Sequence, residues 1–99
     1  MICKSYNKFF EVFANKTRLK IIKALQISNR SVTEICEKIG EEQSKVSHNL
    51  KVLSDCSFVT CSRDGKRRVY ALNDETIVPL MDIVDRHVEK NCKICRVKK

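Results

Sequence analysis

The stretch SVTEICEKIGEEQSKVSHNLKVL, residues 31–53, predicts two short helices joined by a turn at Gly40. Ser31, followed three residues later by Glu34, is a capping box that marks the start of the first helix. On both sides of Gly40, apolar residues recur at the i, i+3, i+4 and i+7 spacing of one helical face. They are Val32, Ile35, Cys36 and Ile39 in the first helix, and Val46, Leu50 and Leu53 in the second, placed at about 43–54.

The second helix carries a polar stripe opposite its apolar one. Ser44, Ser47, His48 and Lys51 share a helical face, with Gln43 at its start and no acid among them. Such side chains hydrogen bond to base edges when a helix inserts its N-terminal end into the DNA major groove. The stretch therefore predicts a helix-turn-helix in which Gln43, Ser44, Ser47 and His48 contact bases.

Downstream, the helical spacing gives way to the alternation typical of β-strands. Residues 58–63 and 67–72 are strand-like, and Asp64-Gly65-Lys66 separates them. Asp-Gly between such runs predicts a hairpin, because glycine takes the positive φ that a type I′ turn requires. The basic cluster at its tip would alone only protect a sheet edge, but beside a helix-turn-helix it predicts a wing. The candidates for the DNA backbone are Lys45, Lys51, Arg63, Lys66, Arg67 and Arg68, with Arg67 as the candidate for insertion into the minor groove.

Three further helices are expected around this unit. Residues 5–14 carry an aromatic face, and residues 17–26 bury Leu19, Ile22 and Leu25 or the overlapping Ile21 and Ala24. Residues 74–90 form the last helix, which should become regular at 76–79 because Pro79 is tolerated only near a helix start. The first and last helices carry more apolar surface than the core needs, and a two-fold contact would bury the same patch twice. The candidates for this dimer interface are Phe9, Phe10, Leu80, Met81, Val84 and Val88.

The composition fits a single domain over residues 1–99, mainly α-helical with a small β-hairpin. The chain has 20 Lys and Arg against 12 Asp and Glu, a net charge of +8, which favours phosphate backbones or anionic surfaces as partners. No apolar run of about 18 residues and no signal peptide is present. A cytoplasmic protein without a membrane partner is therefore expected.

The order helix, helix, helix-turn-helix, hairpin, helix resembles the ArsR-type winged helix-turn-helix regulators. FANKTRLKIIKAL (13–25), SVTEICEKIG (31–40), QSKVSHNLKVL (43–53) and FVTCSRDGKRRVYAL (58–72) carry the resemblance. It implies a homodimer paired through the first and last helices, here 1–14 and 76–95. It also implies binding to an imperfect inverted repeat and repression of transcription. Glu41-Glu42 depart from the family pattern, which has an apolar residue and a serine cap there.

The metal sites known in the family are incomplete in this sequence. Where some members place Cys-x-Cys in the helix-turn-helix, Ser31 and Thr33 stand here. Asp85 and His87 match half of a second zinc site, but Lys98 replaces its other histidine. Cys3, Cys92 and Cys95 lie near the ends of the two terminal helices, where they leave a structural role, a redox switch or a soft-metal site such as zinc open. No cofactor is required for DNA binding.

Sequence-specific binding of double-stranded DNA is the function that these features favour. A winged helix used for protein or RNA contact would not need both the polar stripe and the basic hairpin. An enzyme is not expected, because the C-x-x-C of Cys92 and Cys95 lacks a βαβ context and no carboxylate pair or Ser/His/Asp arrangement stands out. No small-molecule substrate is therefore expected.

Overall fold

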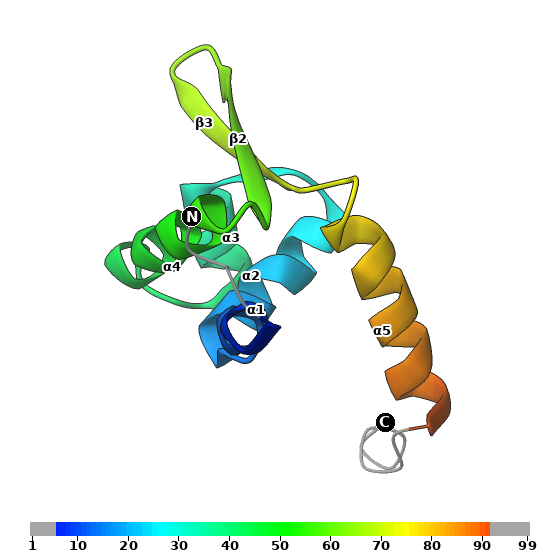
Figure 1. The fold of residues 1–99 in the computed structure, drawn as a ribbon. Coiled ribbons are helices and arrows are strands. Elements are labelled where there is room, and N and C mark those ends of the chain that lie inside the picture. The colour runs from blue at the N-terminus through cyan, green and yellow to red at the C-terminus, as the bar shows by residue number, and fades with distance from the viewer. Residues whose placement is uncertain (1–5, 92–99) are drawn as a thin grey trace.

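The fold of residues 6–91, the part that the computed structural model describes, is a set of helices with a small antiparallel sheet (Figure 1). This is the mainly helical fold with a β-hairpin that the sequence predicts. None of the described helices is long and apolar enough to span a bilayer. In chain order the elements are α1 (Tyr6–Phe13), α2 (Lys16–Ile27), β1 (Arg30–Ser31), α3 (Val32–Ile39), α4 (Gln43–Asp55), β2 (Val59–Asp64), β3 (Arg67–Leu72) and α5 (Ile77–Asn91).

Local sequence signals set the helix boundaries. The Asn15 side chain accepts a hydrogen bond from the Arg18 backbone N–H at 3.0 Å and caps α2. Both bonds of the predicted capping box at the start of α3 are present, because Ser31 and Glu34 each accept from the other's backbone N–H. Gly40 ends α3 with a φ of +72°, the left-handed conformation common after a helix. Pro79 lies in the first turn of α5, as expected.

The sheet has one strand that the sequence does not predict. Arg30 and Ser31 pair with Tyr70 and Val69, so the strand order is β1-β3-β2. At the hairpin tip Asp64 pairs with Arg67, which leaves Gly65 and Lys66 as the central residues of the turn. Among the described residues only Gly40, Ser57 and Gly65 have positive φ. A positive φ at the first central position alone is the requirement of a type II′ turn, so the predicted type I′ turn is wrong.

The core is formed by α2, α3, α4 and the base of the hairpin. Phe58 is 1 % exposed, and its ring lies against Phe9 and Phe13 at centroid distances of 5.0 and 5.3 Å. Thus α1 packs part of its aromatic face on the core of its own chain. From α2, the core takes Ile21, Ile22, Ala24 and Leu25, which come from both predicted alternatives, whereas Leu19, a member of the first alternative, is exposed.

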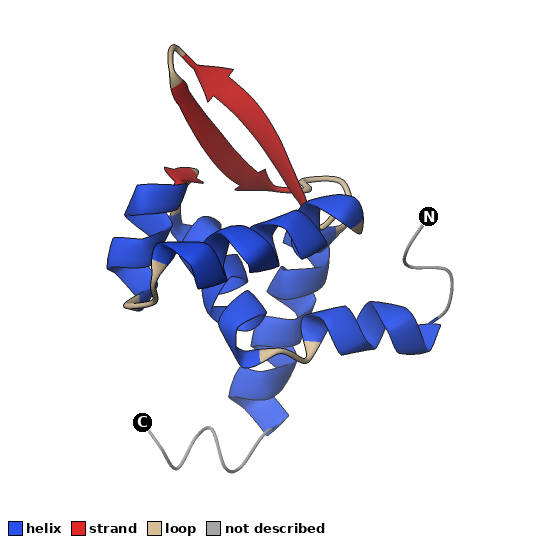
Figure 2. Cartoon of the chain, turned by 90° about the vertical axis from the view of Figure 1, so that its left-hand side faces the viewer, coloured by secondary structure: helices blue, strands red, loops and turns tan. Residues whose placement is uncertain are grey.

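The hairpin projects away from the helices, and its tip lies at the opposite end of the molecule from the C-terminal part of α5 (Figures 1 and 2). The helix α4 runs across the body below the hairpin (Figure 2). The molecule therefore has one end formed by the wing and another formed by the terminal helices.

Candidate nucleic-acid interface

The two faces of α4 differ as the sequence predicts. Val46, Leu50 and Leu53 are buried in the core, and Gln43, Ser44, Ser47 and His48 are all exposed. The Ser44 hydroxyl donates to the Glu42 carboxylate at 2.7 Å, and Glu42 itself makes no capping bond to the helix. The exposed face thus presents hydroxyl, amide and imidazole groups without an intervening acid.

A buried polar contact fixes α4 on α2. Arg18 donates from Nε to the side-chain oxygen of Asn49 at 3.0 Å, and Asn49 donates to the Lys45 carbonyl at 2.9 Å. Asn49 is 6 % exposed, so its amide is satisfied inside the protein. Sequence reasoning missed this positioning pair. The available signal was that Asn49, a polar residue, lies three residues after Val46 and four before Leu53, on the apolar face of the helix.

Glu41 explains how an acid is accommodated at the start of α4. Its carboxylate binds Lys45 and Lys20, each at 3.2 Å, and so joins α4 to α2. Hydrogen bonds from Lys45 and Lys20 hold the pKa of Glu41 below its usual value. The charge of the acid is therefore balanced locally, and its two ion pairs support the position of α4.

The wing separates its cations onto two faces. Arg63 stands directly opposite Arg68 in the β2–β3 register, although like charges in such a pair destabilise a sheet. Arg67 stands opposite Asp64, and its guanidinium binds the Glu34 carboxylate of α3 at 3.2 Å. Because the Ser31 backbone N–H also donates to Glu34, the pKa of Glu34 is lowered, with Arg67 adding to the effect. Arg67 is thus tied to α3 in the free protein.

The six predicted backbone-binding cations are all exposed but differ in their partners. Lys45 binds Glu41, Lys51 binds Asp55 at 3.6 Å, and Arg67 binds Glu34. Within residues 6–91, no ion pair involves the remaining three, Arg63, Lys66 and Arg68. The tip of the wing therefore holds cations that can bind an anion without first breaking an ion pair within residues 6–91.

The residues predicted for the dimer interface are not equally accessible. Phe10 is 60 % exposed and Val84 36 %, whereas Met81 is buried in the core of its own chain at 2 %. Phe9, Leu80 and Val88 are half-buried. Met81 therefore has almost no surface to offer a partner.

The described residues do not fit a metal centre. Ser31, at a family thiolate position, uses its hydroxyl to cap α3, and Thr33 supplies no thiolate. Asp85 is bound by Lys23 and Gln26 at 2.9 and 3.0 Å, and His87 lies 3.4 Å from the Asn91 amide. No cluster of three or more His, Cys, Asp or Glu side chains suited to a metal occurs within residues 6–91. Cys3, Cys92, Cys95 and Lys98 lie outside this range.

Comparison with known proteins agrees with this arrangement. Residues 15–60 match the model of the arsR family of bacterial regulatory proteins. A probable mercury resistance operon repressor of Streptomyces lividans is 35 % identical over 75 % of this chain, which spans 59 % of that relative's length. The arsenical resistance operon repressor of Bacillus subtilis is 32 % identical, and the alignment covers 98 % of this chain and 88 % of the relative.

Solved structures show the same fold. Rv0081 of Mycobacterium tuberculosis superposes with a TM-score of 0.79 at 32 % identity, covering 92 % of this chain and 91 % of that one. The homodimeric winged helix-turn-helix DNA-binding domain of Mb0332 from Mycobacterium bovis gives 0.76 at 27 % identity, covering 83 % and 76 %. With its winged helix-turn-helix and these relatives, the chain belongs to the arsR family of bacterial regulatory proteins.

Proposed function

We propose that this protein is a sequence-specific regulator of transcription, a repressor that binds an inverted repeat in double-stranded DNA as a homodimer. The observation that carries the proposal is the pairing of an acid-free polar stripe on α4 with a wing whose Arg63, Lys66 and Arg68 have no acidic partner within residues 6–91. Major-groove readout needs the first feature, and phosphate binding needs the second. The repressors among the relatives support the same function.

Base readout is assigned to Gln43, Ser44, Ser47 and His48. All four are exposed on the N-terminal half of α4, the part of a recognition helix that contacts base edges. The test begins with selection of a cognate site from random duplexes and from the DNA upstream of the protein's own gene. Replacing Ser47 or His48 with Ala should then cost about 1–3 kcal/mol on that site and less on random DNA. An equal loss on both would assign these residues to the backbone, and failure of selection would refute operator binding.

Phosphate binding is assigned to Lys45, Lys51 and the wing. Because Arg63, Lys66 and Arg68 need not break an ion pair first, each should contribute its full charge to counterion release. Removing one should weaken all sequences alike and reduce the salt slope by about one unit. We place Arg67 at the minor groove once it leaves Glu34. An unchanged slope in the Arg63→Ala and Arg68→Ala variants would mean that the wing does not touch DNA.

We further propose that residues 1–99 act as one domain, which dimerises through residues 1–14 and 76–95.

We also propose that Cys3, Cys92 and Cys95 modulate DNA binding through oxidation or a soft metal such as zinc. The support is the position of these cysteines in the sequence, beside the two terminal helices. A bond or metal there would change the angle between protomers and hence the half-site spacing. DNA titrations of a triple Cys3, Cys92 and Cys95→Ser variant, with and without oxidant or zinc, provide the test. Wild-type-like responses in that variant would exclude these thiols as the sensor.

A further inference from the structure

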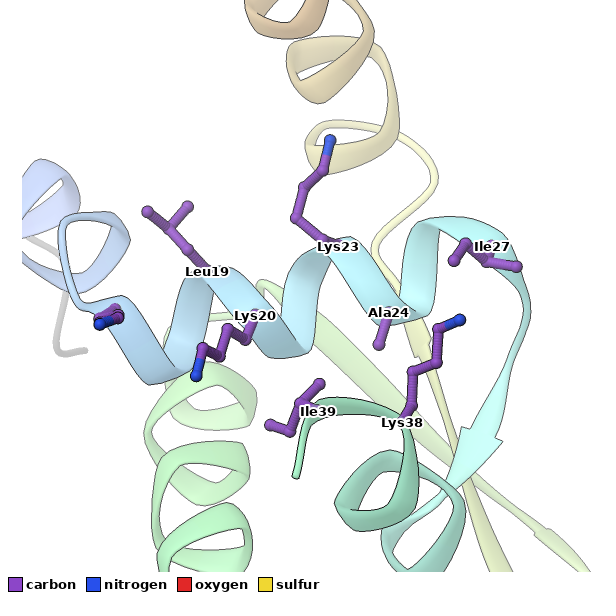
Figure 3. A pocket seen from close by; sticks show the side chains of 8 residues that line it. Leu19, Lys20, Lys23, Ala24, Ile27, Lys38 and Ile39 are labelled. Carbon is purple, nitrogen blue, oxygen red and sulfur yellow. The ribbon is translucent and has the colours of Figure 1, made fainter. Parts of the chain in front are cut away.

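A groove of about 560 Å³ lies on α2 beside the C-terminal end of α3 (Figure 3). Its floor is apolar, formed by Leu19, Ala24 and Ile27 of α2 and by Ile39 of α3. Leu19 is 38 % exposed and Ile27 66 %, so the core does not use them. From Leu19 to Ile27 the strip runs about 12 Å along α2, at 1.5 Å per residue. Exposed apolar side chains rimmed by polar ones make this groove a candidate contact site for another molecule.

The remaining lining residues are all lysines. Lys16, Lys20 and Lys23 follow α2, and Lys38 reaches up from α3 (Figure 3). No acid belongs to the lining, although Glu41 and Asp85 bind Lys20 and Lys23 from outside it. Over the described chain, Lys16 and Lys38 take part in no ion pair. The groove thus combines an apolar floor with positive charge spread along two helical turns.

We propose that this groove docks an acidic amphipathic segment of a partner protein. A helix lying in a groove inserts apolar residues at i, i+4 and i+7, and carboxylates on its flanks would meet the lysines. Distributed charge of this kind matches several carboxylates better than a single head group. A phosphate backbone would make no favourable contact with the exposed apolar side chains of Leu19 and Ile27.

Neither residues 92–99 nor helix α1 of a second copy matches the charge of the groove. Residues 92–99, CKICRVKK, contain four basic residues and no acid. The helix α1 of a second copy carries one lysine and one glutamate, which do not balance the lysines of the groove. An acidic partner is the occupant that charge complementarity selects.

The test uses a fluorescent synthetic helix with leucines at i, i+4 and i+7 and glutamates on both flanks. A peptide of the same composition in scrambled order is the reference. Fluorescence anisotropy with the full chain should show saturable binding of the first peptide and at least tenfold weaker binding of the second. The double variant Lys16→Ala, Lys38→Ala should weaken binding about threefold to tenfold, as expected for two exposed ion pairs. Lys66→Ala on the wing removes a charge elsewhere and should leave peptide binding unchanged, although it should weaken DNA binding.

Ile27→Asp tests the apolar floor and should weaken binding about tenfold, whereas Ile83→Asp, at an exposed isoleucine of α5, should not. Equal binding of both peptides would reduce the effect to non-specific charge and overturn the proposal. A change in sedimentation of Ile27→Asp without peptide would assign the groove to a second copy. A lower salt slope for DNA in the double lysine variant would assign it to the phosphate backbone. Either result would equally overturn it.

Discussion

The two ends of the molecule expose different chemistry over one shared core. At the wing end, α4 exposes Ser47 and His48, and the hairpin exposes Arg63 and Arg68, which form no ion pair within residues 6–91. At the other end, Phe10 of α1 and Ile83 and Val84 of α5 are 60 %, 57 % and 36 % exposed. A hydrated polyanion fits the first surface, because its phosphates stay wet while base edges are read. Only another apolar surface fits the second. The contrast supports the proposal that the protein binds DNA at one end and pairs with itself at the other.

The largest effect is expected from introducing charges into the exposed apolar surface of α1 and α5. The double variant Phe10→Asp, Val84→Asp should be monomeric and should lose about 100-fold or more in affinity for a two-half-site operator, because linked binding is lost. Sedimentation and DNA titration measure the two effects. Asn7→Asp adds a charge to α1 at an exposed polar position and should leave both unchanged. A double variant that remains dimeric would place the interface elsewhere.

The attachment of the DNA-reading helix offers the next test. Asn49→Ala leaves the Arg18 guanidinium without its acceptor and the Lys45 carbonyl without its donor, at a cost of about 2 kcal/mol in unfolding free energy. Ser47→Ala, on the exposed face, should change stability by less than about 0.5 kcal/mol. Urea unfolding of the two variants therefore separates a positioning residue from one proposed to contact DNA. Equal stabilities would show that α4 does not depend on this contact.

The helix-turn-helix was predictable from sequence because each of its determinants is local. Ser31 and Glu34 cap α3 three residues apart, and Gly40 supplies the left-handed conformation at the turn. The strand β1 was not predictable, because two residues carry no alternation and their pairing depends on Tyr70 and Val69, about 40 residues away. The exposure of Leu19 was not predictable for a similar reason. The helix α2 has apolar residues on more than one face, and only tertiary packing decides which face is buried.

The candidate site divides along the same line. The exposure of Ser47 and His48 followed from helical spacing alone. The partners of the cations did not, because Arg67 meets Glu34 only once β3 has paired with β1 at the start of α3. The turn type was also not predictable. The strand register pairs Asp64 with Arg67, and this long-range pairing makes Gly65 and Lys66 the two central residues of the turn. Local sequence patterns thus located the candidate site, whereas tertiary contacts decide which of its charged side chains are free of an ion pair within residues 6–91.

The C-terminal end of α4 offers a substitution that should raise the stability of the protein, by less than Asn49→Ala lowers it. Ser57 has a φ of +63°, and the Ser57 and Phe58 backbone N–H groups bind the Ser54 and Leu53 carbonyls at 3.0 and 2.8 Å, a Schellman motif. Glycine avoids the Cβ strain of this conformation, so Ser57→Gly should raise stability by about 1 kcal/mol. Gly40→Ala, at the end of α3, should lower it by a similar amount, because a Cβ there meets no atom within 4 Å and only backbone strain counts. Thermal unfolding of both variants checks the pair, and a loss in Ser57→Gly would contradict it.

The smallest effect concerns the contact that holds α5 on α2. Burial raises the pKa of Asp85, but hydrogen bonds from Lys23 and Gln26 and the Lys23 charge outweigh it, so the pKa lies below the ordinary 3.8. A lowered folded-state pKa contributes stability above about pH 3.8 that is lost as the pH falls through the folded value. Because the Asp85 side chain is 42 % exposed, Asp85→Asn should cost less than about 1 kcal/mol at neutral pH.

That cost should begin to shrink as the pH falls below 3.8 and should approach zero below the lowered folded-state pKa, where the native carboxyl is protonated as well. Urea unfolding of Asp85→Asn and wild type at neutral and acidic pH measures the difference. Asp82→Asn is the matched control on the same helix, because in residues 6–91 the Asp82 carboxylate forms no ion pair. It should leave stability unchanged at both values. A cost for Asp85→Asn that persists in acid would mean that the side chain holds α5 through hydrogen bonding of its neutral form rather than through its charge.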